Sequence, residues 1–265
     1  MKISLIISTY NKPEYLSHCL KSISELDELP DEIIVADDGS GKETSDLIEK
    51  FRIQFPIQLI HVWQEDKGFR LSRSRNNGIL KSSGDYLIFI DDDLILHPKF
   101  IADHRKFAAK GFFYCGTRVR LGAKKTAEMM KTHRNVVSCL EGDIRSRLNS
   151  IRIPFLHKLI TGPGYTYKRL RGCHIAFWKN DLMKVNGFDE RYASYGREDS
   201  DIALRMMHAG VKRINLKWAA ICYHLHHPAA KSTSQNDHLM FEVIRNKTTR
   251  SQIGIEQHLD SLRQI

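Results

Sequence analysis

The stretch that decides the fold is YLIFIDDD, residues 86–93, in which five apolar residues are followed by three aspartates. A short, continuous apolar run of this kind is typical of a strand buried on both faces of a parallel sheet. Residues 2–7 and 32–36, both rich in Ile and Val, have the same character. Ligands of open α/β sheets bind beyond the carboxyl ends of the strands, so the polar residues after each run are candidates for a binding site.

Helical patterns separate these runs. Apolar residues recur at helical spacing over residues 16–23, after Pro13, which is tolerated in the first turn of a helix. We also predict a helix around residues 47–51, a strand at 58–62 and a helix at 72–80. The alternation predicts an α/β fold, with a single Rossmann-like domain whose mostly parallel sheet carries helices on both faces.

The second half of the chain has weaker patterns. We predict strands at residues 112–119 and 219–224. Two helices are predicted at residues 180–185 and 200–209, each ended by a glycine.

The composition fits one globular domain, because 265 residues with 42% hydrophobic content can bury a sizeable core. The five cysteines are scattered and never spaced as Cys-x-x-Cys, which argues against a disulfide framework or a zinc ribbon. No apolar run approaches the roughly 18 residues of a membrane span, and the first residues lack the pattern of a signal peptide. We therefore expect a soluble protein of the cytoplasm.

The net charge of +10 is concentrated in residues 105–171. Such an excess indicates an anionic partner: nucleic acid, an acidic glycan, a phosphorylated lipid or the cytoplasmic face of the membrane. Within this segment apolar residues recur at near-helical spacing beside four cations, although Pro154 must break or kink a helix. The apolar residues are Ile144, Leu148, Ile151, Phe155 and Leu159, and the cations are Arg145, Arg147, Arg152 and Lys158. The pattern favours peripheral binding to an anionic membrane, and the alternative is a core-packed helix with a solvated basic face.

Three consecutive carboxylates after a buried strand repel one another unless a positive charge lies among them. A divalent cation supplies that charge, and Asp91 and Asp93 would point to the same side of a continued strand. One could bind the cation while the other holds a metal-bound water or a ribose hydroxyl. The alternative is a solvated acidic turn in which an aspartate caps a helix near Pro98.

Acidic residues are also dense between residues 187 and 201. Ahead of an amphipathic helix they interact favourably with the helix dipole, and a carboxylate at a helix start can equally serve as a general base. The local pattern does not choose between these two roles.

The segment YHLHH, residues 223–227, places His224 and His226 on one face of an extended chain. A single histidine usually belongs to the core or the surface, but three beside a suspected cation site make at least one a candidate ligand. Imidazole would favour Mn²⁺ over Mg²⁺, and zinc bound with Cys222 is disfavoured because the aspartates prefer harder ions. The sequence leaves open whether His224 or His226 is the ligand.

Together these residues resemble glycosyltransferase family 2. The nucleotide-binding half of that family is similar, in order and spacing, to IISTYN at 6–11, ADDGS at 36–40 and IDDD at 90–93. The later residues are similar to the carboxyl-terminal motif of β-galactosyltransferases and bacterial chondroitin-polymerase-type enzymes, here RGC at 171–173, FW at 177–178, NGFD at 186–189 and GREDSD at 196–201. The matches span residues 2 to 227.

The resemblance implies a nucleotide-sugar transferase fold in three parts. Residues 1–110 would bind the nucleotide sugar, residues 111–230 would form the acceptor-binding and catalytic half of the same domain, and residues 231–265 would be a tail with one short helix around 239–244.

The resemblance also implies roles for the donor-site residues. Ser8, Tyr10 and Asp38 would hold the base, normally uracil. Arg75 falls where such enzymes place a basic residue near the nucleotide, and its alternative is an arginine on a solvated helix face.

The resemblance assigns Asp91 to the ribose or the metal shell, Asp93 to the metal itself and His224 to the distant second ligand. Asp92 is counted among the residues that bind the nucleotide sugar.

On the acceptor side, Asp199 matches the general base of the family, with Glu198 reaching hydroxyls of the acceptor or donor. Trp178 belongs either to this site or to the core. Arg197 departs from the pattern, because galactosyltransferases commonly have a glycine before the Glu-Asp pair, and this leaves the sugar and acceptor open.

The implied activity is inverting and metal-dependent: a hexose or N-acetylhexosamine moves from a UDP-sugar to a glycan or lipid-linked glycan, in bacterial surface polysaccharide or lipopolysaccharide synthesis. Two other classes compete. A sugar-phosphate nucleotidyltransferase should have a Gly-rich, basic loop after the first strand, and residues 8–11 contain none. A non-enzymatic nucleic-acid-binding protein would leave the carboxylates without a role and lacks a recognisable motif, so no nucleic-acid partner is expected.

Overall fold

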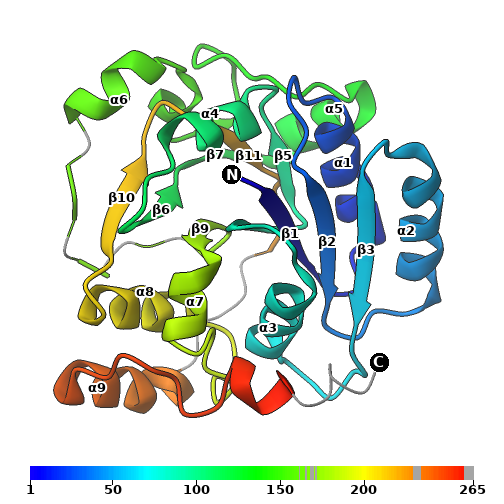
Figure 1. Ribbon diagram of the computed structural model, residues 1–265. Helices are drawn as coiled ribbons and strands as arrows, with labels where there is room; N and C mark the ends of the chain where they lie inside the picture. The colour runs from blue at the N-terminus through cyan, green and yellow to red at the C-terminus, as the bar shows by residue number, and fades with distance from the viewer. Residues whose placement is uncertain (161, 165, 168–169, 171, 229–233, 260–265) are drawn as a thin grey trace.

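The apolar runs of the first half form the centre of a seven-stranded sheet, as Figure 1 shows for the computed structural model. The structure describes residues 1–160, 162–164, 166–167, 170, 172–228 and 234–259. In sheet order the strands are β10 (Lys212–Leu216), β6 (Phe112–Gly116), β9 (His174–Trp178), β4 (Tyr86–Asp91), β1 (Ile3–Thr9), β2 (Glu32–Asp37) and β3 (Gln58–Trp63).

The strand pairs of this sheet are parallel, except that β9 runs antiparallel to β4 and β6. Every residue of β1 and β2 is buried. Continuous burial explains why these strands have unbroken apolar runs and no alternation. The predicted strands at 2–7, 32–36, 58–62 and 86–90 are confirmed within a residue or two at each end.

Helices cover both faces of the sheet. The α-helices are α1 (Pro13–Ser24), α2 (Lys42–Gln54), α3 (Leu71–Lys81), α4 (Phe100–Phe107), α5 (Ala123–Thr132), α6 (Pro154–Ile160), α7 (Lys179–Lys184), α8 (Glu198–His208) and α9 (Asp237–Asn246). Apolar residues of α1, α2 and α4 pack in one core cluster, and those of α3, α7 and α8 pack in a second cluster on the other face. The predicted α/β fold with helices on both faces is confirmed.

A second, four-stranded sheet lies beside the first. Its order is β5 (Leu94–Leu96), β11 (Cys222–His224), β7 (Arg118–Leu121) and β8 (Ile144–Arg145). The single strand predicted at 112–119 is therefore wrong, because β6 and β7 belong to different sheets. The break follows Gly116, where a side chain would collide with the ring of His174.

The strand predicted at 219–224 shortens to β11. Trp218 and Ala220 have positive φ angles of 61° and 45°, which do not fit an extended strand. Strands β9 and β10 were not predicted as strands: the end of β9 was read only as part of a motif, and β10 contains the polar residues Lys212, Arg213 and Asn215.

The near-helical spacing of residues 144–159 does not form one helix, and the break expected at Pro154 is present. The segment contains β8, a 3₁₀ turn at Arg147–Ser150 and α6, and Ser146 between the first two has a φ of +59°. Pro154 begins α6, where a missing N–H costs nothing, and does not kink a helix. The side chains of Lys158 and Leu159 lie outside the described residues.

The last described part of the chain, residues 234–259, packs against the domain. It contains two 3₁₀ turns, Ser234–Asn236 and Ile255–His258, and helix α9, which lies along α8 (Figure 1). Met240 and Val243 of α9 form a small core with Leu204 of α8. Among the described residues, no helix is both long and apolar enough to cross a bilayer.

Candidate active site

The carboxyl ends of β1, β2 and β4 bring the predicted donor-site residues to one edge of the sheet. Ser8 lies opposite Asp91 in the pairing of β1 with β4, and Thr9 lies opposite Asp37 in the pairing of β1 with β2. Asp38 follows directly, and its amide donates to the carbonyl of Thr9 at 3.0 Å. Parallel pairing therefore assembles this side of the site from three distant segments.

The predicted base site is built around Asp38. Its carboxylate accepts hydrogen bonds from the side chain of Gln64 at 2.5 Å and from the backbone amide of Arg70 at 2.8 Å. Burial raises the pKa of Asp38, and these two bonds oppose the rise. Tyr10 is about half exposed and donates its hydroxyl to Asp66, so its ring stands at the mouth of the site.

Asp93 lies between two histidines from a segment more than a hundred residues away. Its Oδ1 is 3.5 Å from His224 Nε2, and its Oδ2 is 2.8 Å from His227 Nε2. The three candidate ligand atoms lie within 4.8 Å of one another. His227 was not predicted as a ligand, although the clustering of histidines at 223–227 was the signal for it.

His226, the alternative to His224, points elsewhere. Its backbone N–H donates to Thr126 of α5 at 2.8 Å, and its exposed side chain lines a pocket between α1 and α5. An extended chain would place His224 and His226 on the same face. Because β11 ends at His224, the chain turns there, and His227 lies beside Asp93 in place of His226.

The electrostatics of this cluster suit a cation. Burial raises the pKa of Asp93, but the hydrogen bond of His227 and the charges of His224 and Lys12 outweigh it and lower the pKa overall. Burial lowers the pKa of His224 to about 4, so this ring is neutral at pH 7, as a metal ligand must be. Asp93 Oδ1 is buried and has no hydrogen-bond partner among the described residues. One carboxylate and two imidazoles, with an unsatisfied buried oxygen, fit a divalent cation.

Asp92 is turned away from this cluster. Its carboxylate accepts the Thr9 hydroxyl at 2.7 Å, and burial raises its pKa to about 7. Asp92 therefore ties the loop to β1, and its contact with a nucleotide stays a prediction.

Arg75 of α3 connects the two sides of the site. It is 1% exposed, so the solvated arginine considered from the sequence is excluded. Its guanidinium donates to Ser8 at 3.2 Å and to Asp91 at 3.1 Å, and its Nη1 lies 3.7 Å from Glu198 Oε1. Its neighbour Asn76 exchanges hydrogen bonds with the backbone of Phe188. Helix α3 thus joins the donor edge to the acceptor side.

Glu198 and Asp199 stand in the first turn of α8. Glu198 is buried, and burial together with the charge of Asp199 raises its pKa to about 7 against the opposing charge of Arg75. Asp199 accepts from the backbone amides of Gly172 at 2.8 Å and Ser200 at 2.6 Å, which fix its orientation. A Cβ at Gly172 would lie 2.9 Å from Cβ of Asp199, so only glycine permits this approach. Arg171, before it, lies outside the described residues.

Arg197 immediately precedes these two carboxylates and has a φ of +79°. This left-handed conformation favours glycine, the residue that the related galactosyltransferase motif has here. The arginine side chain donates to Asp237 of α9 at 2.7 Å. The arginine in place of glycine therefore strains the backbone, and its side chain gains a contact with α9.

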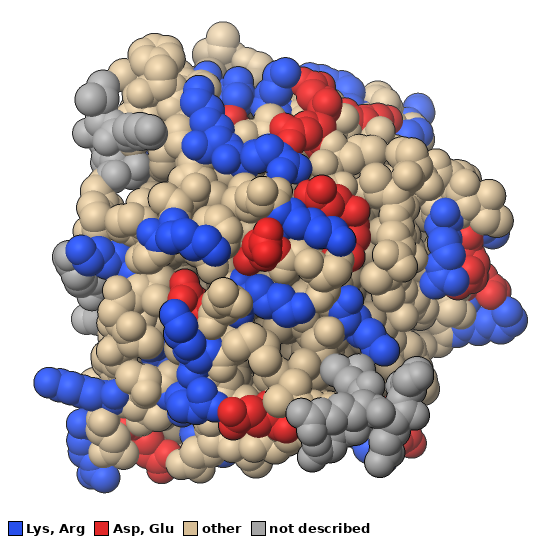
Figure 2. Space-filling model, viewed as in Figure 1, with Lys and Arg blue, Asp and Glu red and all other residues tan. Residues whose placement is uncertain are grey.

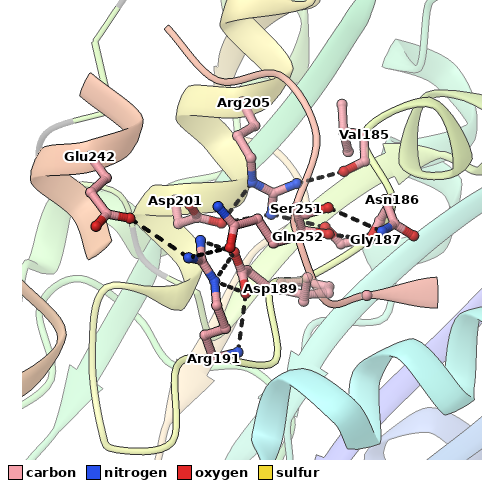
Figure 3. A network of polar contacts seen from close by, with 12 residues as sticks. Val185, Asn186, Gly187, Asp189, Arg191, Asp201, Arg205, Glu242, Ser251 and Gln252 are labelled. Carbon is pink, nitrogen blue, oxygen red and sulfur yellow. Dashed lines mark hydrogen bonds and ion pairs between the residues drawn. The ribbon is translucent and has the colours of Figure 1, made fainter. Parts of the chain in front are cut away.

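The other acidic residues of this region belong to a structural network (Figure 3). Asp201 is fully buried and binds Arg205 at 2.6 Å, and Arg205 also donates to the carbonyls of Val185 and Gly187 (Figure 3). Asp189 is bound by Arg191 at 2.7 Å. The structure thus separates the dense acidic stretch into two parts. Asp189 and Asp201 are paired with Arg191 and Arg205 in this network, whereas Glu198 and Asp199 lie at the candidate site.

Trp178 is a core residue, which decides between the two roles that the sequence left open. Its side chain is 6% exposed, its ring packs on Tyr86, and its indole N–H donates to the carbonyl of Ala109. It lies at the end of β9 opposite the start of β4, far from the carboxyl edge.

The comparisons with known proteins agree with this geometry. The model of glycosyl transferase family 2 matches residues 4–169, and the model described as the N-terminal domain of galactosyltransferase matches residues 158–228. The chain is 23% identical to the chondroitin synthase of Escherichia coli, over 87% of this chain and 35% of that protein. It spans only 27% to 66% of the length of the five curated relatives that it matches over most of its own sequence.

Two solved structures share the fold. The structure of TarS from Staphylococcus aureus in complex with UDP has a TM-score of 0.62 and 17% sequence identity to this chain. The match covers 97% of this chain and 68% of the TarS chain. The structure of the mannosyltransferase PcManGT from Pyrobaculum calidifontis in complex with GDP-Man and Mn²⁺ has a TM-score of 0.58 and 17% sequence identity to this chain. The match covers 93% of this chain and 61% of the PcManGT chain.

The fold and the two family matches together define a glycosyltransferase. Because the first family model matches more than half of its residues, the chain belongs to glycosyltransferase family 2. The resemblance drawn from the motifs is confirmed, and a glycosyltransferase replaces the nucleotidyltransferase and the nucleic-acid-binding protein as the class of this chain.

Proposed function

We propose that this chain is an inverting, metal-dependent glycosyltransferase that moves a hexose or an N-acetylhexosamine from a UDP-sugar to a glycan. The observation that best supports this proposal is the pair of contacts of Arg75. Its guanidinium contacts Asp91 at the donor edge and Glu198 at the start of α8. A donor bound along the strand ends would therefore have its sugar beside the first turn of α8.

The donor site accounts for the nucleotide. Asp38 would accept from the imide N–H of uracil, Tyr10 would cover the ring, and Ser8 would complete the base site. Asp91, at the end of β4, would meet the ribose. The UDP complex of TarS supports this choice of nucleotide by analogy of fold.

Asp93, His224 and His227 would hold the cation, with Mn²⁺ preferred over Mg²⁺ because two imidazoles suit a transition metal. When bound, this cation supplies Lewis-acid stabilisation of the diphosphate that departs. The Mn²⁺ complex of the mannosyltransferase PcManGT supports the choice.

Asp199 would be the general base. Its carboxylate takes the proton of an acceptor hydroxyl while the oxygen forms a bond to the anomeric carbon. The bond from that carbon to the diphosphate oxygen breaks, and UDP leaves with the electron pair. One displacement from the opposite face inverts the anomeric configuration. Glu198 would hold a hydroxyl of the acceptor or the sugar in the attacking geometry.

The acceptor would be a glycan of bacterial surface polysaccharide or lipopolysaccharide, either soluble or lipid-linked. We place the reaction in the cytoplasm. The five unpaired cysteines support this, because a reducing compartment keeps thiols free.

A panel of nucleotide sugars with Mn²⁺ tests the proposal, scored for nucleotide release with and without glycan acceptors. UDP with Mn²⁺ should also raise the melting temperature more than either alone, because diphosphate, cation and Asp93 complement one another's charge.

Asp93→Asn should abolish both the transfer and the joint stabilisation, since it removes the carboxylate between the two histidines. Asp46→Asn, on the exposed side of α2, is the matched control and should change neither. Unchanged melting temperatures with UDP, GDP and dTDP in the presence of metal would refute the donor site.

A further inference from the structure

Three large apolar side chains stand exposed in one short stretch of the chain. Leu140 is 88% exposed, Leu148 is 63% exposed and Phe155 is 73% exposed. Each loses favourable burial of about 25 cal/mol for every Å² left in water. A group of such side chains on a soluble surface marks a place where something else binds.

Hydrogen bonds hold these three residues on one surface. Arg147 donates to the carbonyl of Cys139, next to Leu140. The indole of Trp218 donates to the carbonyl of Leu148, and the carbonyl of Trp218 accepts from Ile153, just before α6 and Phe155. These bonds tie the backbone at residues 139, 148 and 153 into one framework beside α6. We define the cationic apolar patch as Leu140, Arg145, Arg147, Leu148, Phe155 and Lys217.

The three cations of the patch, Arg145, Arg147 and Lys217, are exposed, and no ion pair within the described residues engages them. Arg147 also donates through Nη1 to the carbonyls of Cys139 and Glu141, and Lys217 lies over the ring of Trp218. The nearby Glu141 is already held by Lys125 and Arg134.

Arg152, which the sequence had grouped with these cations, is not available. It binds the buried carboxylate of Asp103 through two nitrogens, at 3.0 and 2.5 Å. Figure 2 shows Lys and Arg side chains along the upper edge of the molecule, with Asp and Glu side chains among them.

The patch borders the active site through the smaller sheet. In its register His224 lies opposite Arg120, and Arg120 lies opposite Arg145. Two strand spacings make roughly 10 Å. A surface that docks at Arg145 would thus be close to the candidate metal site.

We propose that the cationic apolar patch docks onto an anionic lipid bilayer. Arginine and lysine would contact the headgroups while the three apolar side chains enter the boundary of the acyl region. An acidic glycan would use the cations but would leave Leu140, Leu148 and Phe155 in water. The proposal goes beyond the transfer reaction and depends on no step of it.

Sedimentation with vesicles tests the docking. The protein should bind vesicles that contain phosphatidylglycerol, release them as salt rises and ignore pure phosphatidylcholine. Arg145→Gln with Arg147→Gln should weaken binding by roughly 30-fold. Leu148→Ser with Phe155→Ser should weaken it by roughly 10-fold or more, since both halves of the patch are needed.

Helix α9 supplies the matched controls. Phe241 is 68% exposed and Arg245 is exposed, and α9 lies at the opposite end of the molecule from α6 (Figure 1). Phe241→Ser with Arg245→Gln should leave vesicle binding unchanged. Stabilisation by UDP and Mn²⁺ in every variant would show that the fold is intact.

Equal vesicle binding by the patch variants and the α9 variant would overturn the proposal. So would an absence of binding, or binding that survives Leu148→Ser with Phe155→Ser and is displaced by a soluble acidic polysaccharide. The last result would identify an acidic glycan as the partner. Nucleotide release with a soluble acceptor is measured separately, so a failure of docking and a failure of the transfer reaction remain distinguishable.

Discussion

The donor edge and the acceptor side of this site are built in different ways. At the donor edge, Ser8, Asp38 and Asp91 lie at or directly after the last residues of β1, β2 and β4, and parallel pairing brings these strand ends together. On the acceptor side, Asp199 is oriented by Gly172, and α8 is held by the buried Arg205. The first depends on local sequence and the second on contacts between distant segments. Variants on the acceptor side should therefore affect catalysis and stability separately, whereas variants at the donor edge affect ligand binding.

The largest effect should come from Asp199→Asn, which keeps the shape and removes the base. Turnover should fall by roughly 10² to 10⁴, the range for lost general-base catalysis. UDP affinity should stay nearly unchanged, because Asp199 does not face the nucleotide site. Transfer kinetics with UDP titrations check this separation, and turnover like that of the unaltered protein would place the base elsewhere.

Arg205→Met should break the support of α8. Breaking a fully buried ion pair costs about 3–5 kcal/mol, and the carbonyls of Val185 and Gly187 also lose a donor. The free energy of unfolding, measured in urea, should fall by that amount. Lys42→Met is the control, because its ion pair with Asp46 is exposed on both sides, and it should cost about 1 kcal/mol or less. Equal losses in the two variants would mean that burial of the pair is irrelevant.

Variants of His226 and His227 test which histidine binds the cation. His227→Ala should weaken Mn²⁺ binding by at least roughly 10-fold, because the ring lies 2.8 Å from Asp93. His226→Ala, one residue earlier and exposed, should leave it unchanged. Calorimetric titration of Mn²⁺ in the presence of UDP measures both. The opposite ranking would return the ligand to His226.

The smallest effect should be a gain. Arg197→Gly removes a left-handed arginine and should stabilise the fold by about 1 kcal/mol, less the modest ion pair to Asp237. Arg197→Ala loses the same ion pair but keeps the strained backbone. The difference in the free energy of unfolding between the two variants therefore measures the cost of the left-handed conformation. A glycine variant no more stable than the alanine variant would show that the conformation is unstrained.

The sequence was sufficient for the first half of the fold and insufficient for much of the second. Unbroken apolar runs identified β1, β2 and β4, because burial on both faces leaves a clear local signal. The division of 112–119 between two sheets had no such signal, since it depends on the ring of His174 packed against Gly116.

The candidate site shows the same limit. Asp91 and Asp93 could be singled out locally, but the choice of His227 over His226 depends on where β11 ends. The dense acidic stretch could not be divided by pattern, because Asp201 differs from Asp199 only in having a buried arginine opposite it. The roles of all these residues in binding and catalysis stay predictions.

The reversed direction of β9 has a consequence for how such a protein can diversify. Because β9 runs against its neighbours, the chain enters it at the edge where β1, β2 and β4 leave, and Cys173 meets Asp91 there. Gly172, just ahead of β9, donates its amide to Asp199, and a side chain at this position would collide with that residue. A substitution at the start of β9 would therefore reach the proposed base directly, without altering any residue of β1, β2 or β4.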